Sequence, residues 1–593
     1  MAEEDIDIST EETIEKAYDT KLMKRLIKYT KPYYKYFFAA IILLLLNTLA
    51  DLASPYLVKI AIDDYIIKTQ NGSAVVKLGL LYILLIIVAF LLNYGQIFVL
   101  TQAGQRIVYS LRQELFNHIQ RLPLKVFDTT PVGKLVTRIT NDTETLNDMY
   151  TNVLVTLLKD ISMIIGIIII LFSMNLKLAG IVLLVLPIIL IITAIFRIKV
   201  RDVYRRIRVS VSKINTVLSE NLSGIRIIQI FNREKPNYRE FKKVNDEFYK
   251  AGVSEVVVYG VFRPIINMLS FFAIALIIFF GGSKVLDSTI TFGVLYAFIN
   301  YISMLFQPIN DLAEKYNILQ SSMAASERIF AILDMEEETD EGSKLSNEEI
   351  HGEVEFKNVW FAYNNEDYVL KDVSFKVPAG KTVAIVGATG AGKTSIISLI
   401  NRLYNINKGS ILIDGRELPT ISLESLRGAV GMVLQDVFLF SGDIAKNIHL
   451  NDTSMSNDYI NQVANYVNAS SFIEKLPSKY SEEVKEGGAT LSTGQRQLLA
   501  FARALAFDPK ILILDEATAN IDTETEYLIQ DALSKLTKNR TTIIIAHRLS
   551  TIQHADNIIV MHKGKIREMG THNDLLSMKG LYYNLYKLQY KES

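Results

Sequence analysis

The stretch that decides the fold reads GATGAGKTS and runs through Gly387, Ala388, Thr389, Gly390, Ala391, Gly392, Lys393, Thr394 and Ser395. An apolar run at residues 382–386 precedes it, and residues 395–404 have the pattern of a helix, so the context is strand, glycine-rich loop and helix. Such a loop wraps a polyphosphate with inward-pointing N–H groups at the positive end of a helix. We therefore expect these residues to bind ATP, with Lys393 on the β- and γ-phosphates and Thr394 on Mg²⁺.

Two carboxylates form a second element of the same predicted site. Asp515 and Glu516 directly follow the aliphatic run ILIL at residues 511–514. A buried strand of a parallel sheet delivers the side chains that follow it to the edge where ligands bind. We expect Asp515 to hold Mg²⁺ and Glu516 to activate the attacking water. The alternative is a surface acidic pair without a catalytic role, and the four preceding aliphatic residues argue against it.

Composition indicates a membrane protein of several domains. The chain has 593 residues, 50% of them apolar, and its mean hydropathy of +0.22 is unusual for a soluble protein. Lys and Arg balance Asp and Glu at 63 each, which argues against nucleic-acid binding driven by global charge. Cysteine is absent, which excludes disulfides and thiolate metal sites.

Six apolar stretches in the first half each have a length close to what a bilayer core requires. They lie at residues 36–62, 75–101, 152–174, 177–199, 256–286 and 290–318. Four prolines fall within or near them and should kink the helices: Pro55, Pro187, Pro264 and Pro308. A basic amphipathic stretch at residues 21–35 predicts an elbow helix on the membrane surface. The sequence thus predicts an all-α transmembrane domain over residues 21–330 in the cell (plasma or inner) membrane.

Positive charge is concentrated before the first span and in the long links that follow the second and fourth spans. The positive-inside rule places these segments, both termini and the second half of the chain in the cytoplasm. The links are periodic, so we expect two cytoplasmic helical hairpins, broken at residues 129–133 (TTPVG) and 232–237 (NREKPN). We expect residues 138–142 (RITND) and the NREKPN region to contact the second half of the chain. Passive extension of the helical bundle is the alternative.

Polar residues within the predicted spans are candidates for substrate contact, because burying them in lipid is costly. They include Asn47, Asp51, Asn93, Gln96, Lys159, Asp160, Arg263, Asn300 and Gln307. Together with aromatic residues in the sixth span, they would suit a cavity for an amphipathic small molecule. Polar contacts between helices are the alternative for any single residue. Asp51 stands out as a candidate counter-ion for a cation.

The remaining segments differ in composition. Residues 1–20 are acidic and lack an apolar core, so they predict a solvated tail rather than a signal peptide. Residues 331–350 are acidic and poor in apolar residues, as is typical of a linker. Residues 351–593 alternate apolar strands with helices, which predicts an α/β domain with a largely parallel sheet.

The stretch LSTGQRQ at residues 491–497 resembles the signature sequence of the ABC ATPases, which is normally LSGGQ. The matching positions are Leu491, Ser492, Thr493, Gly494 and Gln495. Tyr363 resembles the aromatic residue that stacks on adenine, and Gln435 resembles the glutamine that senses Mg²⁺ and the γ-phosphate. Asp522 resembles the D-loop aspartate, and His547 the switch histidine. Six spans ahead of one such domain resemble an ABC exporter half-transporter over the whole chain.

The resemblance implies that the signature residues bind an ATP held by a second nucleotide-binding domain, so the chain needs a second half-transporter as its partner. Lys393 and Mg²⁺ would offset phosphate charge, Glu516 would handle the water, and His547 would hold the γ-phosphate in register. The implied function is export of amphipathic drugs or lipids by alternating access, driven by ATP hydrolysis. Peptide export, or an ATP-gated membrane sensor without transport, is the alternative.

Two motifs depart from the family pattern. Thr493 replaces a glycine of the signature, and the D-loop reads ANID at residues 519–522. Since Lys393, Glu516 and His547 are present, the resemblance implies that the chain's own loop supports hydrolysis, whereas the site completed by its signature is weak. This asymmetry favours a heterodimer over a homodimer.

Overall fold

The computed structural model describes residues 20–364, 367–515, 523–545 and 552–591. Contacts divide the chain into two compact units. The first unit comprises Met1–Arg121 and Thr130–Glu336, and the second comprises Leu122–Thr129 and Glu337–Ser593. Almost all of the expected acidic tail lies outside the described residues.

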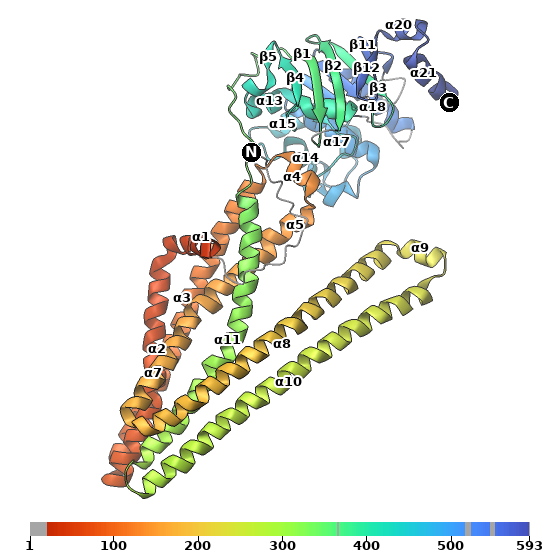
Figure 1. Cartoon of the computed structure of the whole chain (residues 1–593). Helices are drawn as coiled ribbons and strands as arrows, with labels where there is room; N and C mark the ends of the chain where they lie inside the picture. Colours follow the sequence, from red (N-terminus) through yellow and green to blue (C-terminus); the bar gives the residue numbers. More distant parts are fainter. Residues whose placement is uncertain (1–19, 365–366, 516–522, 546–551, 592–593) are drawn as a thin grey trace. The chain divides into compact units, whose positions relative to one another are not determined.

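The first unit is built from helices (Figure 1). In chain order they are α1 (Thr20–Thr30), η1 (Lys31–Tyr33), α2 (Tyr34–Ile60), η2 (Ala61–Lys68), α3 (Gly72–Ile119), α5 (Val132–Thr137), η3 (Arg138–Asp142), α6 (Thr143–Asp148), η4 (Met149–Val153), α7 (Leu154–Met174), α8 (Leu176–Ser223), α9 (Ile225–Ile230), α10 (Glu234–Leu286) and α11 (Phe292–Leu333). Side-chain oxygens of Asn71, Asn175 and Thr291 cap the first turns of α3, α8 and α11. These caps satisfy backbone N–H groups that a helix start leaves unpaired, so each short connection leads directly into the next helix.

The expected membrane spans map onto α2, α3, α7, α8, α10 and α11. Within the described residues, four helical stretches combine the length and hydropathy of a span: Thr20–Lys68, Gly72–Ile119, Val132–Met174 and Glu234–Leu286. A shorter apolar segment, Phe292–Pro308, begins α11. Large apolar side chains such as Leu84, Phe90 and Ile169 are exposed on these helices, as a lipid environment requires. The prediction of a helical transmembrane domain is confirmed.

Helices α8 and α10 form a long hairpin with α9 at its tip (Figure 1). Gly224 ends α8, and the chain turns into α10 at residues 231–233, which overlap the start of the predicted NREKPN breaker. Ile227, Ile230 and Phe231 at this tip are 63%, 79% and 69% exposed. The tip therefore presents apolar side chains to its surroundings.

The segment Arg138–Asp142 makes a buried contact within the first unit, and its expected contact with the second half of the chain stays a prediction. Asp142 is only 5% exposed, and its carboxylate accepts hydrogen bonds from Arg138 at 2.9 Å and from Arg328 Nε at 3.0 Å. Because Arg328 lies in α11, this buried carboxylate ties the first hairpin to the last helix within the first unit. The segment Leu122–Thr129 of the first long link, which contains α4 (Leu124–Thr129), groups with the second unit.

The second unit contains two main sheets. One is four-stranded in the order β2-β1-β4-β5, and its pairs are antiparallel. The other is six-stranded in the order β12-β11-β3-β10-β9-β6, and only β12 runs antiparallel. The strands are β1 (Val354–Ala362), β2 (Tyr368–Val377), β3 (Thr382–Gly387), β4 (Lys408–Ile413), β5 (Arg416–Glu417), β6 (Val430–Val433), β9 (Ile511–Asp515), β10 (Thr541–Ile545), β11 (Asn557–His562) and β12 (Lys565–Gly570); β7 (Gly442–Asp443) and β8 (Glu483–Val484) pair separately.

Helices cover both sheets and complete the α/β domain. They are α12 (Lys393–Ile400), η5 (Leu418–Thr420), α13 (Leu423–Ala429), α14 (Ile444–His449), α15 (Asn457–Tyr466), α16 (Ser470–Ile473), η6 (Lys479–Ser481), η7 (Glu486–Gly488), α17 (Thr493–Ala506), α18 (Thr523–Leu536), α20 (His572–Ser577) and α21 (Leu581–Lys591). One apolar core lies between the two sheets, and a second packs α14–α18 against the other face of the parallel sheet. The predicted α/β ATPase fold is confirmed, and the antiparallel sheet adds to it.

Candidate functional site

The glycine-rich loop joins β3 to α12, as the sequence predicts. Gly392 ends the loop with φ +98°, and a Cβ at this position would lie 2.6 Å from the side chain of Leu370. Only glycine adopts this left-handed conformation without strain in so little space. The loop is thereby tightened against β2 just before α12 begins. The positive end of α12 faces the loop interior, which is the arrangement that binds phosphate.

Lys393 is 7% exposed and carries its ammonium group into the loop. Its Nζ donates hydrogen bonds to the carbonyl oxygens of Gly387 at 2.7 Å and Ala388 at 3.2 Å. Thr394 is exposed beside it, whereas Ser395 is buried. The loop thus holds one cation at its centre, placed to meet an anionic ligand, and one hydroxyl open to a metal ion.

Tyr363 follows β1 and lies against the loop helix. Its hydroxyl is 3.0 Å from Ser395 Oγ, and its ring meets the ring of Tyr404 edge to face at 5.0 Å. The Tyr404 hydroxyl in turn donates a hydrogen bond to Asp128 of α4, within the same unit. The predicted adenine-stacking residue is therefore next to the phosphate loop, and a half-exposed ring face suits a planar base.

The carboxyl ends of β3, β9, β10 and β6 meet at one edge of the parallel sheet. Asp515 ends β9, is 8% exposed, and pairs in register with Ile545, which pairs with Ile385 just before the loop. Gln435 follows β6 by two residues at the same edge and is exposed. The structure therefore brings Asp515 and Gln435 to the edge that carries the glycine-rich loop.

Three predicted site residues lie outside the described residues: Glu516, Asp522 and His547. Their roles stay predictions from the sequence. Glu516 directly follows Asp515, and His547 follows the last residue of β10 by two positions, so both leave strands that end at the same edge.

Oxygen donors dominate the candidate metal ligands. Thr394, Asp515 and Gln435 offer a hydroxyl, a carboxylate and an amide carbonyl, which fit Mg²⁺ better than softer metals. In the described part of the chain, no cluster of three or more His, Cys, Asp or Glu side chains forms an alternative metal site. When bound, Mg²⁺ would neutralise phosphate charge.

The signature residues begin helix α17. Ser492 is its N-cap, and a capping box joins the Ser492 and Gln495 side chains to each other's backbone N–H groups. Arg496 donates hydrogen bonds to the Leu491 carbonyl at 2.8 Å and to Thr493 Oγ1 at 3.2 Å. Gly494 is buried in the first turn, whereas Thr493 is exposed. Among the described residues, these hydrogen bonds are local, and Ser492 and Thr493 are exposed at the start of the helix.

Polar residues of the membrane domain pair across helices. Lys159 in α7 lies 3.8 Å from Asp51 in α2, and the neighbouring Asp160 forms an ion pair with Lys315 in α11. The sequence analysis identified Lys159, Asp51 and Asp160 as candidates but did not identify Lys315. Lys315 stands near the end of the last span, in the polar stretch NDLAEK. Asn47 and Gln96 are buried among the helices, as the packing alternative expects.

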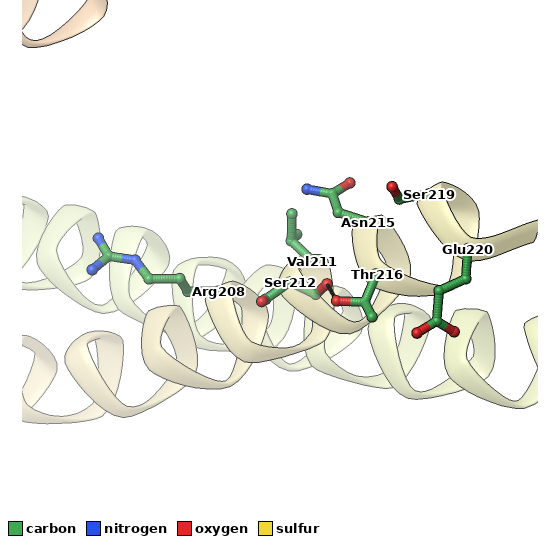
Figure 2. A pocket seen from close by; sticks show the side chains of 7 residues that line it. All are labelled: Arg208, Val211, Ser212, Asn215, Thr216, Ser219 and Glu220. Carbon is green, nitrogen blue, oxygen red and sulfur yellow. Dashed lines mark hydrogen bonds between the residues drawn. The ribbon is translucent and has the colours of Figure 1, made fainter. Parts of the chain in front are cut away.

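An open groove of about 600 Å³ runs along the hairpin helix α8 (Figure 2). Its lining is Arg208, Val211, Ser212, Asn215, Thr216, Ser219 and Glu220. Figure 2 shows Asn215 and Ser219 pointing from one side of α8. This polar face adds to the apolar tip as hairpin surface available to another molecule.

Comparisons with known proteins agree with this architecture. Residues 37–309 match the family model of the ABC transporter transmembrane region, and residues 370–519 match that of the ABC transporter. The probable multidrug resistance ABC transporter ATP-binding/permease protein YheH of Bacillus subtilis (strain 168) is 42% identical over 511 residues, covering 85% of this chain and 75% of that protein. The ATP-dependent lipid A-core flippase of Escherichia coli (strain K12) is 36% identical over 549 residues, covering 92% and 94%.

A solved structure is similar over nearly the whole chain. The structure of a bacterial Atm1-family ABC exporter with ATP bound superposes with a TM-score of 0.79 at 28% identity. The match covers 94% of this chain and 99% of the other.

Proposed function

This chain belongs to the ABC transporters, as an exporter half-transporter that couples ATP hydrolysis to transport, and we propose that it exports amphipathic small molecules such as drugs or lipids. The observation that carries the proposal is the fusion of a helical transmembrane domain to an ATPase whose loop and signature lie on separate elements. The multidrug and lipid-flippase relatives support this class of substrate. Positive charge in the links supports cytoplasmic termini and a cytoplasmic ATPase domain.

ABC exporters function as dimers, and two features of this chain fit the proposed use of a partner. The signature helix directs its free N-terminal face away from its local partners, where it would contact ATP held by the second chain. The apolar α9 tip and the polar face of α8 would contact the partner as well. Clamping two ATP molecules would then draw the nucleotide domains together and swing the spans, a shift that needs about 5.5 kcal/mol of differential binding.

The transport proposal is tested with inverted membrane vesicles that contain the chain and its partner. We expect Mg-ATP to drive accumulation of fluorescent amphipathic dyes, both cationic and neutral, and the Glu516→Gln variant to abolish it. ATP hydrolysis without flux of any dye would contradict export and favour a sensor.

The α9 tip gives a second prediction. Phe231→Asp should uncouple transport from ATP hydrolysis, because a charge at the apolar tip weakens docking on the partner. We expect dye flux to fall about tenfold or more while ATP binding is unchanged. Tyr249→Asp is the control, since Tyr249 on α10 is similarly exposed at 68% but lies away from the tip. Equal loss of flux in both variants would contradict a specific role for the tip.

Thr493 gives a test of the proposed heterodimer. If the chain pairs with itself, both ATP sites are completed by a signature with Thr493, whose added side chain crowds the phosphate-facing helix start. We expect the lone purified chain to hydrolyse ATP slowly and Thr493→Gly to raise the rate about tenfold, which corresponds to roughly 1.4 kcal/mol. Thr537→Gly makes the same change directly after α18, outside the signature, and should leave the rate of hydrolysis unchanged. Rapid hydrolysis by the unmodified lone chain would favour a homodimer.

A further inference from the structure

A cavity of about 300 Å³ lies among α2, α3 and α11 within the transmembrane unit. Asp51, Ser54 and Asn300 supply its polar lining, and apolar side chains that include Leu85 and Met304 supply the rest. Small-molecule sites have this combination of apolar walls and a few convergent polar groups.

Two donors of the polar lining are already used within the protein, which leaves mainly oxygen acceptors for a ligand. Ser54 donates its hydroxyl proton to Tyr82 at 3.0 Å, and the Asn300 amide donates to the carbonyl of Tyr296 at 2.9 Å. Pro55 has no N–H to donate to the carbonyl of Asp51, which lies four residues earlier in α2. Asp51 therefore brings a carboxylate to this wall, and its backbone carbonyl lacks the N–H that residue 55 would usually donate.

The partners of Asp51 hold its carboxylate only loosely. Lys159 Nζ lies at 3.8 Å and Asn47 Nδ2 at 3.5 Å, whereas charge-assisted hydrogen bonds measure about 2.7–2.9 Å. No other partner of this side chain is recorded within the described residues. Lys159 thus offsets the negative charge through space but leaves the carboxylate oxygens open to a better-placed donor. The neighbouring pair between Asp160 and Lys315 is in direct hydrogen-bond contact and offers no such opening.

We infer that this cavity binds the protonated amine of an amphipathic ligand, with the ammonium group on Asp51 and the apolar body against Leu85 and Met304. An ammonium group supplies three N–H donors and a positive charge, which matches an acceptor-rich site with one carboxylate. A neutral or anionic head group matches it less well. The inference rests on the proposed export function and narrows its substrate class.

The test measures binding of dansylcadaverine, a fluorescent primary amine, to the full-length chain with its partner in lipid nanodiscs. Its neutral N-acetyl derivative is the matched probe. We expect Asp51→Asn to weaken binding of the amine about tenfold or more and to leave binding of the N-acetyl derivative unchanged. Lys159→Met removes the competing cation, so it should strengthen binding of the amine. If Asp51 and Lys159 served only to hold helices together, both variants would weaken both probes, and the inference would be overturned.

Asn300→Asp extends the test without removing Asp51, should Asp51→Asn fail to fold. A second carboxylate in the cavity should tighten binding of the amine severalfold over the N-acetyl derivative, and the absence of such tightening would refute the site. Flux of neutral dyes in vesicles separates the two proposals. If neutral dyes are transported but both probes bind equally well, the amine site is refuted and export is not. If the unmodified protein transports no dye at all, export itself is refuted.

Discussion

Glu516→Gln should leave ATP bound to the protein and slow its hydrolysis about a thousandfold. Asp515 ends the buried strand β9 at the edge that carries the phosphate loop, and Glu516 is the next residue in the sequence. Glutamine preserves the shape of glutamate but cannot accept a proton from the attacking water. Phosphate release under saturating Mg-ATP measures the loss, and a thermal shift with Mg-ATP measures retained binding.

The control for this variant is Glu424→Gln. Glu424 lies in the first turn of α13, its side chain is exposed, and it pairs with Lys344 on the protein surface. This change should leave hydrolysis and binding as they are. Because the arrested protein keeps its ATP, it should also remain in a closed dimer that size-exclusion chromatography detects. A normal hydrolysis rate in Glu516→Gln would show that another group activates the water.

The nucleotide-binding domain could be predicted in detail because its signals are local in sequence. The backbone at Gly392 has φ +98° in little space, a conformation that glycine adopts without strain. Asp515 follows four buried aliphatic residues, so its place at the end of a strand could be inferred without knowing any neighbour. Ser492 and Gln495 stand at the spacing of a capping box, which fixes the start of α17.

Contacts between distant segments could not be predicted in the same way. Nothing in the sequence around Asp142 indicates its partner Arg328, which is 186 residues away. The sequence around Lys315 is polar and gives no sign of a partner, whereas the structure pairs Lys315 with Asp160. The pattern of apolar and polar residues shows which face a helix buries, but it does not show which other helix packs against that face.

The membrane domain shows the same limit at its candidate substrate site. Asp51, Lys159 and Asn300 were all identified as polar residues in spans, yet their sequence positions do not reveal that two of them line a cavity and the third lies beside it. For Pro55, the missing N–H is evident from the sequence, whereas the cavity that Pro55 lines is seen only in the structure.

Lys393→Ala should weaken binding of Mg-ATP about a hundredfold, since it removes charge-assisted hydrogen bonds to two phosphate groups. In the structure, the Lys393 ammonium lies among the loop carbonyls of Gly387 and Ala388, so it is already held where the β- and γ-phosphates would bind. Replacement by alanine leaves the loop N–H groups in place, and weak binding should persist. Equilibrium binding of a fluorescent ATP analogue to the dimer measures the change.

Lys381→Ala separates the phosphate role of Lys393 from a role in stability. Lys381 stands just before β3, at the opposite end from the loop, and pairs with Asp556 at 2.9 Å. The N–H of Thr382 and then this ammonium group hold the pKa of the Asp556 carboxyl below its usual value. We expect Lys381→Ala to lower the melting temperature slightly without changing ATP affinity, and Lys393→Ala to lose mainly the thermal shift that Mg-ATP produces. Equal ATP affinity in the two variants would remove Lys393 from the phosphate site.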